Sequence, residues 1–468
     1  MRKWLALLCL IMVLLLAGCQ EQATVGGEKY PVDITELDLS GAPLEDVDAL
    51  GQFTQLKTLD VRNTGITGET YDQLKAMLPD CQIIWTPVFQ GKAYPMDTTA
   101  LTAVELTGSE AAELAYFPAL QSLDATACRE YDALLAILNG HPQLHVDYVA
   151  EVAGQVLTAD TKEAVFSDIT GEDLAVALQL LPELENLRLE GQLPAAEKLV
   201  ELQKNNPQVC FYWEVEICGV AAANDTVELD LSGIAVADVA QVEEKMSYLP
   251  LLETVIMCDC GVSNEEMDAL NRRHEDVRFL WNVTLGPYIT VRTDLKAFIS
   301  RPYKCYLNDE WAYNLRYCTE MVCLDLGHHN ITHCEFVAFM PELKYLILAD
   351  TEVSDLTPLT GLENLIFLEV FLTPVSDYSP LATLTALEDL NICYTQGKDG
   401  APLMQMTWLK RLWWSSCRMS KEDRSLLRET LSNTEIVMNQ YSSTGGGWRK
   451  GQNYFDMRDM LGMDYMEG

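Results

Sequence analysis

Leucine recurs in this chain at a fixed spacing, and this period constrains the fold more than any other feature. The stretches LKYLILADTEV, LIFLEVFLTPV, LEDLNICYTQ and LKRLWWSSCRM follow one another with their first leucines 22 residues apart. The residues at this spacing are Met321, Leu343, Leu365, Leu387 and Leu409, with Ile34 and Leu56 as a further pair near the start. A period of about 20 to 50 residues indicates an array of similar units that bury a continuous core between neighbours.

Each copy follows the pattern LxxLxLxx(N/T/C)xL, and in this it resembles a leucine-rich repeat. The segments SDLTPL, from Ser354, and SDYSPL, from Ser376, resemble the internalin type of bacterial surface repeat across about residues 319–420. The resemblance implies an α/β leucine-rich-repeat solenoid, with a curved parallel sheet and with helices or irregular turns on the convex side.

A longer period is superimposed on the N-terminal part of the chain. Equivalent strands begin at Leu56, Leu120, Leu184 and Leu252, which are 64, 64 and 68 residues apart. Each is followed by a helical stretch and then by an alternating strand such as VCFYWEVEI, which is typical of a half-buried strand. The residues that recur at one place in or just after these strands are Trp85, Tyr148, Trp213 and Trp281, then Gly91, Gly154, Gly219 and Gly286. We expect the aromatic side chains in the core and hairpin turns at the glycines.

These periods, together with the residues at the two ends of the chain, predict the following division. Residues 1–19 form a lipoprotein signal peptide and residues 20–29 a tether. Residues 30–287 form four mixed modules of about 64 residues with extra strand or hairpin segments, and 288–318 form an irregular insertion. Residues 319–440 form regular leucine-rich repeats, and 441–468 form a C-terminal cap or tail rich in aromatic residues and methionine.

The first residues, MRKWLALLCLIMVLLLAGCQ, combine Arg2 and Lys3 with an apolar run from Trp4 to Leu16. This run is shorter than the ~20 residues of a membrane-spanning helix and is typical of a secretory signal peptide. It ends in LAGC, which resembles a bacterial lipobox and implies that Cys19 carries a lipid. The alternative is an ordinary signal peptide that happens to contain a cysteine. A lipid on Cys19 would hold the protein on the extracytoplasmic face of the bacterial cell membrane, with a tether of at most ~35 Å.

Charge and motifs narrow the functional classes. The net charge of −38 at pH 7 argues against a nucleic-acid partner, because phosphates are repelled. The sequence contains no phosphate-binding loop and no HExxH, GxSxG or CxxC motif. In GHHNITHC, His329 and His333 are four residues apart, but the repeat pattern points His329 and Cys334 in diverging directions. We expect no enzyme activity, no catalytic residues, no cofactor and no metal.

The chain has 14 cysteines, and an even number in an exported protein ordinarily suggests disulfides. Some of them fall eight residues after a leading leucine, at the ladder position, which threonine fills in other repeats: Cys128, Cys260 and Cys417. Two more, Cys81 and Cys334, fall at core positions. We expect these five to be buried free thiols. Cys305 and Cys318 flank the irregular insertion and are the pair most consistent with a disulfide.

The adjacent tryptophans of LKRLWWSSC should point to opposite faces of one strand. In the repeat pattern Trp414 is a core residue and Trp413 points outward on the concave face. The outward residues expected to form a binding surface there are Tyr345, Ile347, Phe367, Glu369, Phe371, Asp389, Asn391, Arg411 and Trp413. Two alternatives remain: this aromatic surface is open to ligands, or the insertion or the tail after residue 441 covers it.

The sequence thus predicts a lipid-anchored surface protein that binds a partner through its concave face, in adhesion or another protein–protein interaction. A protein is the first expectation for the ligand, because contiguous exposed aromatic residues mark interaction sites. A glycan stacked on the aromatic rings is the second. The other function classes are a cell-envelope enzyme, or substrate-capture subunit, that uses the repeats as a binding arm, and a structural envelope spacer.

Overall fold

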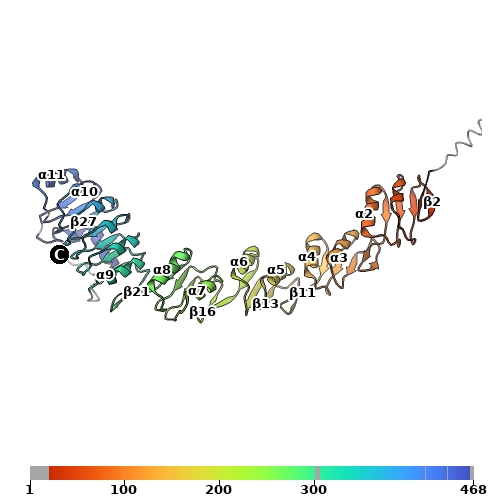
Figure 1. Cartoon of the computed structure of the whole chain (residues 1–468), viewed down its shortest axis with the longest axis horizontal. Coiled ribbons are helices and arrows are strands. Elements are labelled where there is room, and N and C mark those ends of the chain that lie inside the picture. Colours follow the sequence, from red (N-terminus) through yellow and green to blue (C-terminus); the bar gives the residue numbers. More distant parts are fainter. Residues whose placement is uncertain (1–20, 301–305, 417, 440, 464–468) are drawn as a thin grey trace, which may run out of the picture. The chain divides into compact units, whose positions relative to one another are not determined.

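The computed structural model describes residues 21–300, 306–416, 418–439 and 441–463. The chain forms two compact units, Met1–Trp213 and Glu214–Gly468. Both are built from small sheets whose strands are joined by helices, as Figure 1 shows element by element. Cys19 and Cys417 lie outside the described residues.

One structural plan recurs in the modules. A two-stranded antiparallel hairpin is followed by three parallel strands, and a helical segment connects each parallel strand to the next. The hairpin packs against the first helical segment of its own module. In the first module, Ala23 and Val25 of the hairpin are buried in one core with Leu50, Leu74 and Trp85. The hairpin therefore begins each module instead of ending it.

The first unit contains three such modules. The first has β1 (Gln22–Val25), β2 (Glu28–Pro31), β3 (Glu36–Asp38), η1 (Asp48–Gln52), β4 (Thr58–Asp60), α2 (Gly68–Met77) and β5 (Gln82–Ile84). The second has β6 (Val88–Phe89), β7 (Lys92–Ala93), β8 (Ala100–Thr102), α3 (Gly108–Glu113), η2 (Leu114–Tyr116), β9 (Ser122–Asp124), α4 (Tyr131–Gly140) and β10 (His145–Asp147). The third has β11 (Val149–Val152), β12 (Gln155–Thr158), β13 (Glu163–Ser167), α5 (Gly171–Leu180), β14 (Asn186–Glu190), α6 (Ala196–Asn205) and β15 (Cys210–Tyr212).

The second unit begins with a fourth module and continues into one longer sheet. The module has β16 (Glu214–Ile217), β17 (Val220–Ala223), β18 (Glu228–Asp230), α7 (Val239–Met246), β19 (Thr254–Ile256), α8 (Asn264–Arg273) and β20 (Arg278–Leu280). A further hairpin, β21 (Asn282–Gly286) and β22 (Ile289–Arg292), then leads into seven parallel strands. These are β23 (Ala297–Ile299), β24 (Cys323–Asp325), β25 (Tyr345–Ile347), β26 (Phe367–Glu369), β27 (Asp389–Asn391), β28 (Arg411–Trp413) and β29 (Glu435–Val437).

Short helical segments connect these seven strands and are followed by two more near the C-terminus. The connections contain α9 (Asp309–Ala312), η4 (Tyr313–Tyr317), η5 (Glu335–Phe339), η6 (Thr357–Leu359), η7 (Ser379–Thr383), α10 (Ala401–Met404) and α11 (Lys421–Thr430). The last elements are η8 (Trp448–Lys450) and α12 (Gln452–Met460).

The segment 288–318, expected to be irregular, is regular in the parts that the structure describes. Ile289–Arg292 completes a hairpin, and Ala297–Ile299 is the first strand of the seven-stranded sheet, paired with β24. The expectation was wrong because the segment lacks the leucine spacing, whereas Phe298 and Leu307 supply the same buried positions. The regular sheet therefore starts before residue 319.

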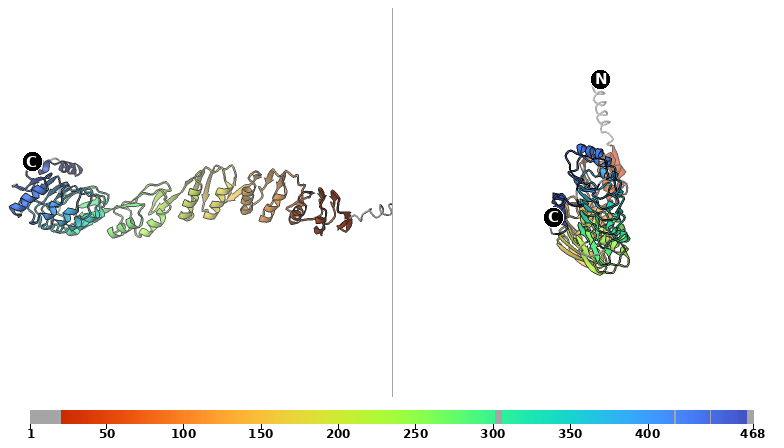
Figure 2. Two further views of the ribbon diagram at one scale, coloured as in Figure 1. Left: turned by 90° about the horizontal axis from the view of Figure 1, so that it is seen from above. Right: turned by 90° about the vertical axis from the view of Figure 1, so that its left-hand side faces the viewer.

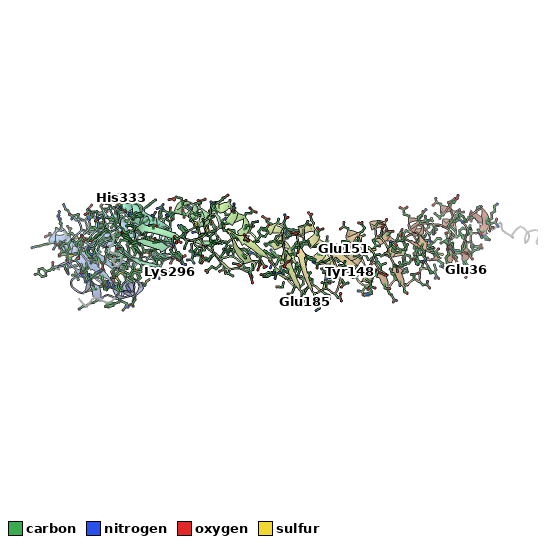
Figure 3. All side chains as sticks on the ribbon, turned by 90° about the horizontal axis from the view of Figure 1, so that it is seen from below. Glu36, Tyr148, Glu151, Glu185, Lys296 and His333 are labelled. Atoms are coloured by element: carbon green, nitrogen blue, oxygen red, sulfur yellow. The ribbon has the colours of Figure 1, made fainter. Side chains whose placement is uncertain are left out.

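The predicted aromatic core and hairpin turns are confirmed. Trp85, Tyr148, Trp213 and Trp281 are each no more than 7 % exposed. The phenol of Tyr148, labelled in Figure 3, donates a hydrogen bond to the carbonyl of Leu180 at 2.8 Å. The turn glycines have positive φ, for example 74° at Gly154, where a side chain would be strained. One detail differs: the alternating segment VCFYWEVEI is interrupted at Trp213 and contributes β15 to a parallel sheet and β16 to a hairpin.

The sequence also explains where the helices and the turns after the strands lie. Five helices begin after a Ser or Thr whose hydroxyl accepts the backbone N–H three residues on: Thr67, Thr107, Thr170, Ser263 and Ser420. At the ladder position, the hydroxyls of Thr64, Thr351, Thr373 and Thr395 donate to the carbonyl three residues earlier, at 2.6–2.7 Å. These buried hydroxyls close the turn that follows each strand.

Candidate functional site

The sheet face expected to be an open binding surface is covered. Its predicted residues lie together on or directly after β25 to β28, but most are buried: Tyr345, Ile347, Phe367, Glu369, Phe371, Asp389, Asn391 and Trp413 are at most 7 % exposed. The side chain of Arg411 is 13 % exposed. The exposure predicted for Trp413 is therefore wrong, and of the two alternatives the covered surface is the one observed.

The covering element is the C-terminal segment of the same chain, residues 441–463, which we call the strap. It contains η8 and α12 and lies against the seven-stranded sheet, as the left view of Figure 2 shows for the last part of the chain. Sheet side chains donate hydrogen bonds to its main-chain carbonyls: Asn391 to Ser443 at 2.9 Å, Trp413 to Gly445 at 2.8 Å, and Arg411 to Gly447 at 3.0 Å and Trp448 at 2.8 Å.

Trp448 is the central apolar contact of the strap. Its ring centroid lies 5.2 Å from that of Phe367 and 5.2 Å from that of Trp413. Its indole N–H donates a hydrogen bond to Oε1 of Glu369. With Tyr454 and Met457 of α12, Trp448 completes a second apolar core on this face.

A buried ion pair adjoins this core. The guanidinium of Arg411 lies 3.2 Å from the carboxylate of Asp389 and stacks on Trp413 and Trp448, with centroid distances of 4.7 and 4.8 Å. Burial raises the pKa of Asp389, and the charge of Arg411 opposes this shift. A buried charge needs such a partner. Arg411 therefore links the sheet to the strap through its ion pair with Asp389 and through the hydrogen bonds that it donates to two strap carbonyls.

The two adjacent tryptophans do point to opposite faces, as predicted. Trp413 faces the strap, whereas Trp414 packs edge-on against Tyr378 at 5.4 Å in the leucine core. Both are fully buried. Trp413 is thus part of the second apolar core, under the strap.

In the four modules, by contrast, most outward positions of the parallel strands are exposed. Many carry an aspartate whose carboxylate accepts the backbone N–H two residues on, at 2.9–3.1 Å: Asp38, Asp60, Asp124 and Asp230. Hydrogen bonds from the side chains two residues on (Ser40, Arg62, Thr126 and Ser232), and then those from the backbone N–H groups, hold the pKa values of these carboxyls below their usual range. These aspartates serve the turns of their own repeats.

The third module departs from this pattern. At the register position of Asp60 it has Arg188, with Val165 beside it on β13 and Tyr212 beside it on β15. Val165 is 42 % exposed, and the guanidinium of Arg188 lies 4.9 Å from the ring centroid of Tyr212. We call these three residues the Val–Arg–Tyr row. Sequence analysis missed it, although the same residue counting that selected Trp413 also selects Arg188.

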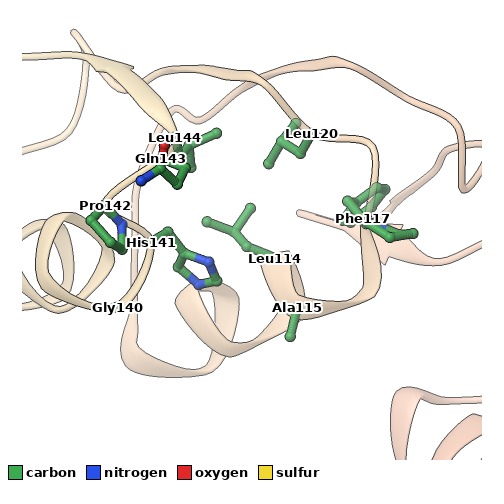
Figure 4. A pocket seen from close by; sticks show the side chains of 10 residues that line it. Leu114, Ala115, Phe117, Leu120, Gly140, His141, Pro142, Gln143 and Leu144 are labelled. Carbon is green, nitrogen blue, oxygen red and sulfur yellow. The ribbon is translucent and has the colours of Figure 1, made fainter.

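The surface of the repeats carries shallow hollows. One of about 370 Å³ lies beside η2 and the end of α4 and is lined mainly by Leu114, Phe117, Leu120, His141 and Leu144 (Figure 4). Another, of about 460 Å³, is lined by Asp309, Arg316, His333 and their neighbours. Within the described residues, no group of three or more His, Cys, Asp or Glu side chains is arranged to hold a metal ion.

His329, from the histidine-rich stretch, occupies a buried turn position. Its Nδ1 accepts the backbone N–H of Leu307 at 3.0 Å, and its Nε2 is hydrogen-bonded to the hydroxyl of Ser300. Burial, with a smaller contribution from the neighbouring His328, lowers the pKa of His329 to about 4. The neutral ring thus links its own turn to Ser300 and Leu307 of the preceding repeat, whereas the ladder threonines bond within their own turns.

The cysteine predictions are confirmed where they fall within the described residues. Cys81, Cys128, Cys260 and Cys334 are free and buried. Cys318 is also a free, fully buried thiol, so the expected pairing with Cys305 is wrong for Cys318, while Cys305 itself lies outside the described residues. Cys318 instead occupies a fully buried position at the C-terminal end of η4.

No protein-family model and no curated protein matches this chain. Among solved structures, internalin C2 from Listeria monocytogenes matches 28 % of this chain and 70 % of its own, at 24 % identity and a TM-score of 0.23. A second internalin, inlF, of that organism matches 89 % of this chain and 91 % of its own, at 14 % identity and 0.26. A leucine-rich-repeat protein from Leptospira interrogans matches 87 % and 96 %, at 17 % identity and 0.29.

Among the described residues, no helix has the length and apolar character needed to cross a membrane. The fold assignment rests on the chain's own strands, ladder turns and 22-residue spacing. By these features the chain is an α/β leucine-rich-repeat solenoid.

Proposed function

We propose that this is a lipid-anchored, internalin-like surface protein of bacteria that binds a protein partner, and that the Val–Arg–Tyr row of the third module is the centre of its open binding face. The single observation that carries the proposal is this row of an aliphatic, a guanidinium and a phenol side chain on adjacent strands, in which Val165 and Arg188 are exposed and Tyr212 is half-buried. Arginine and tyrosine dominate the energetics of protein interfaces, because they combine apolar area with directional hydrogen bonding.

The surroundings of the row support this choice. The equivalent aspartates of the other modules are already hydrogen-bonded to their own turns, and the seven-stranded sheet is covered by the strap. Arg188 is held by Glu190 at 2.9 Å and by Tyr212, so its guanidinium is oriented before a ligand arrives. A side chain ordered in advance loses less conformational entropy on binding.

The anchor belongs to the same proposal. The basic start, the apolar run and LAGC at Leu16–Cys19 support lipid attachment at Cys19 and a place on the extracytoplasmic face of the membrane. Detergent phase partitioning tests this: the natural protein should enter the detergent phase, and Cys19→Ala should not. Equal partitioning of the two proteins would contradict the anchor.

The binding face is tested with a native chemical handle. Cys210 is an exposed free thiol on β15, two residues before Tyr212, and can carry a photo-crosslinker in a background with Cys218→Ser and Cys258→Ser. Crosslinking to arrays of bacterial and host surface proteins and glycans should identify a protein. Arg188→Ala and Tyr212→Ala should each weaken its binding about 10- to 30-fold.

Arg129→Ala is the matched control, since Arg129 is an exposed, ion-paired arginine of the second module. It should leave binding unchanged. If only glycans were captured, the proposal of a protein partner would be wrong and the ligand would be a carbohydrate. Equal binding by the natural protein and the Arg188→Ala variant would exclude this face.

A further inference from the structure

The seven-stranded sheet already recognises a polypeptide, namely the strap. Asn391, Trp413 and Arg411 bond main-chain carbonyls of the strap rather than its side chains. One strap side chain, Trp448, enters an enclosed position between aromatic rings. Grooves that bind peptides use this combination, with main-chain contacts for affinity and a side-chain pocket for selectivity.

The chemistry of the groove specifies what it accepts. Glu369 accepts the indole N–H of Trp448, and the rings of Phe367 and Trp413 pack around the indole. Arg411 donates hydrogen bonds to the carbonyls of Gly447 and of Trp448 itself. The residues just before the tryptophan must be glycine-like, because Gly446 and Gly447 have φ values of 65° and 90°. The recognised element is therefore a tryptophan directly after a glycine turn.

The strap is attached in a way that allows it to leave. It begins shortly after β29, its first residue, Tyr441, is fully exposed, and Gly445–Gly447 lie within its first seven residues. The sheet keeps its own leucine core on the opposite face, where Leu346, Leu368, Leu390 and Leu412 are buried. Departure of the strap would uncover one face and leave the other core intact.

We propose that this face is a peptide-binding groove with the strap as its resident ligand, and that a partner polypeptide presenting a tryptophan after a glycine turn displaces the strap. A tethered ligand acts at a high effective concentration, so the intact protein binds such a partner more weakly than the opened protein does. The groove and the Val–Arg–Tyr row are separate surfaces, and a result at one does not decide the other.

The test separates the strap from the sheet after folding. A protease site is inserted after Tyr441, the purified protein is cut, and the released strap is removed by dilution and gel filtration. A fluorescent peptide of residues 445–463 should then bind the opened protein, and a peptide with Trp448→Ala should bind at least about 30-fold more weakly. A Gly447→Ala peptide should also bind weakly, because its turn is strained. The uncut protein should bind the natural peptide more weakly than the opened protein.

The reactivity of native cysteine thiols shows whether the strap face is uncovered and whether the rest of the repeats stays folded. Cys323 and Cys393 belong to the core under the strap, whereas Cys318 and Cys334 are buried elsewhere in the repeats. Opening should make the first pair react with a thiol reagent and leave the second pair protected, and added peptide should restore protection. A cut strap that never exchanges with labelled peptide, or an opened protein that does not bind it, would overturn the proposal. So would reaction of Cys318 and Cys334 on opening, because the sheet would then not persist without the strap.

Discussion

Arg188 and Trp413 occupy the same outward position of the repeat, four residues after the leading leucines Leu184 and Leu409, yet their surroundings are opposite. The side chain of Arg188 is 51 % exposed, and Trp413 is fully buried under the strap. Most outward residues of the three-stranded sheets are exposed, whereas the outward aromatic and polar residues of β25 to β28 are almost all buried under the strap. The comparison teaches that the repeat pattern specifies the direction of a side chain, while a distant segment determines whether it meets solvent.

The first prediction separates these two positions by stability. Trp413→Ala should destabilise β26 to β28 by ~3–5 kcal/mol, because it removes a large side chain from a packed core and leaves a cavity. Arg188→Ala should change the stability of β13 to β15 by no more than ~0.5 kcal/mol, as is usual for exposed sites. Regional hydrogen exchange measures both. Equal values would show that the strap contributes no packing to the seven-stranded sheet.

The second prediction separates the two regions by pH. His329 binds a proton at about pH 6.5 in the unfolded chain but only near pH 4 in the folded one, so the seven-stranded region should lose stability between these values. The loss should approach roughly 3 kcal/mol at pH 4. The raised pKa of Asp389 acts in the opposite direction. Its carboxyl binds a proton at a higher pH in the folded chain than in the unfolded one, so acidification through this range favours the folded state at this residue.

A matched variant isolates the histidine in this experiment. His329→Gln should have lower stability at neutral pH but should lack the decrease between pH 6.5 and 4. In the modules, the lowered pKa values of Asp38, Asp60, Asp124 and Asp230 mean that their contributions are lost only below about pH 4. If acid unfolding began in the modules rather than in the seven-stranded region, the expected difference in pH dependence would be contradicted.

The third prediction concerns Gly451, which lies against Arg411 of the sheet. A Cβ on Gly451 would overlap the guanidinium of Arg411, so Gly451→Ala should displace this side chain from the carbonyls of Gly447 and Trp448. We expect the strap to be destabilised by ~1–3 kcal/mol. Gly140→Ala is the control, because space is open around this helical glycine of α4, and it should have no such effect. Hydrogen exchange of α12 is the measurement.

The smallest effect is expected at the repeated aspartates. Asp60→Ala removes the carboxylate that accepts the N–H of Arg62 and pairs with its guanidinium, and should cost ~1 kcal/mol in the first module. Glu36→Ala, at an exposed position of β3, is the control and should be nearly neutral. A larger effect at Glu36 would mean that the outward face of this module is not open.

Local patterns made much of the fold predictable from the sequence. The leucine spacing correctly predicts the strands, and the glycines and buried aromatic residues correctly predict the hairpins, because each depends on residues close together in the chain. The sequence left open whether the strap covers the aromatic face, because no short-range pattern pairs Trp448 with Phe367, 81 residues earlier. The Val–Arg–Tyr row was missed although Arg188 stands at a countable position, because the third module has no cluster of outward aromatic residues like that of β25 to β28.

The hairpins that separate the sheets have a mechanical consequence. In the described part of the chain, no parallel strand of one module pairs with a strand of the next, so each hydrogen-bonded ladder ends within its own module. If the chain is pulled from its ends, a module can break without shearing its neighbour's hydrogen bonds. Each module of about 64 residues would release roughly 220 Å of extended chain. Under load the molecule would therefore lengthen in discrete steps, and each step would limit the tension transmitted to whatever holds its ends.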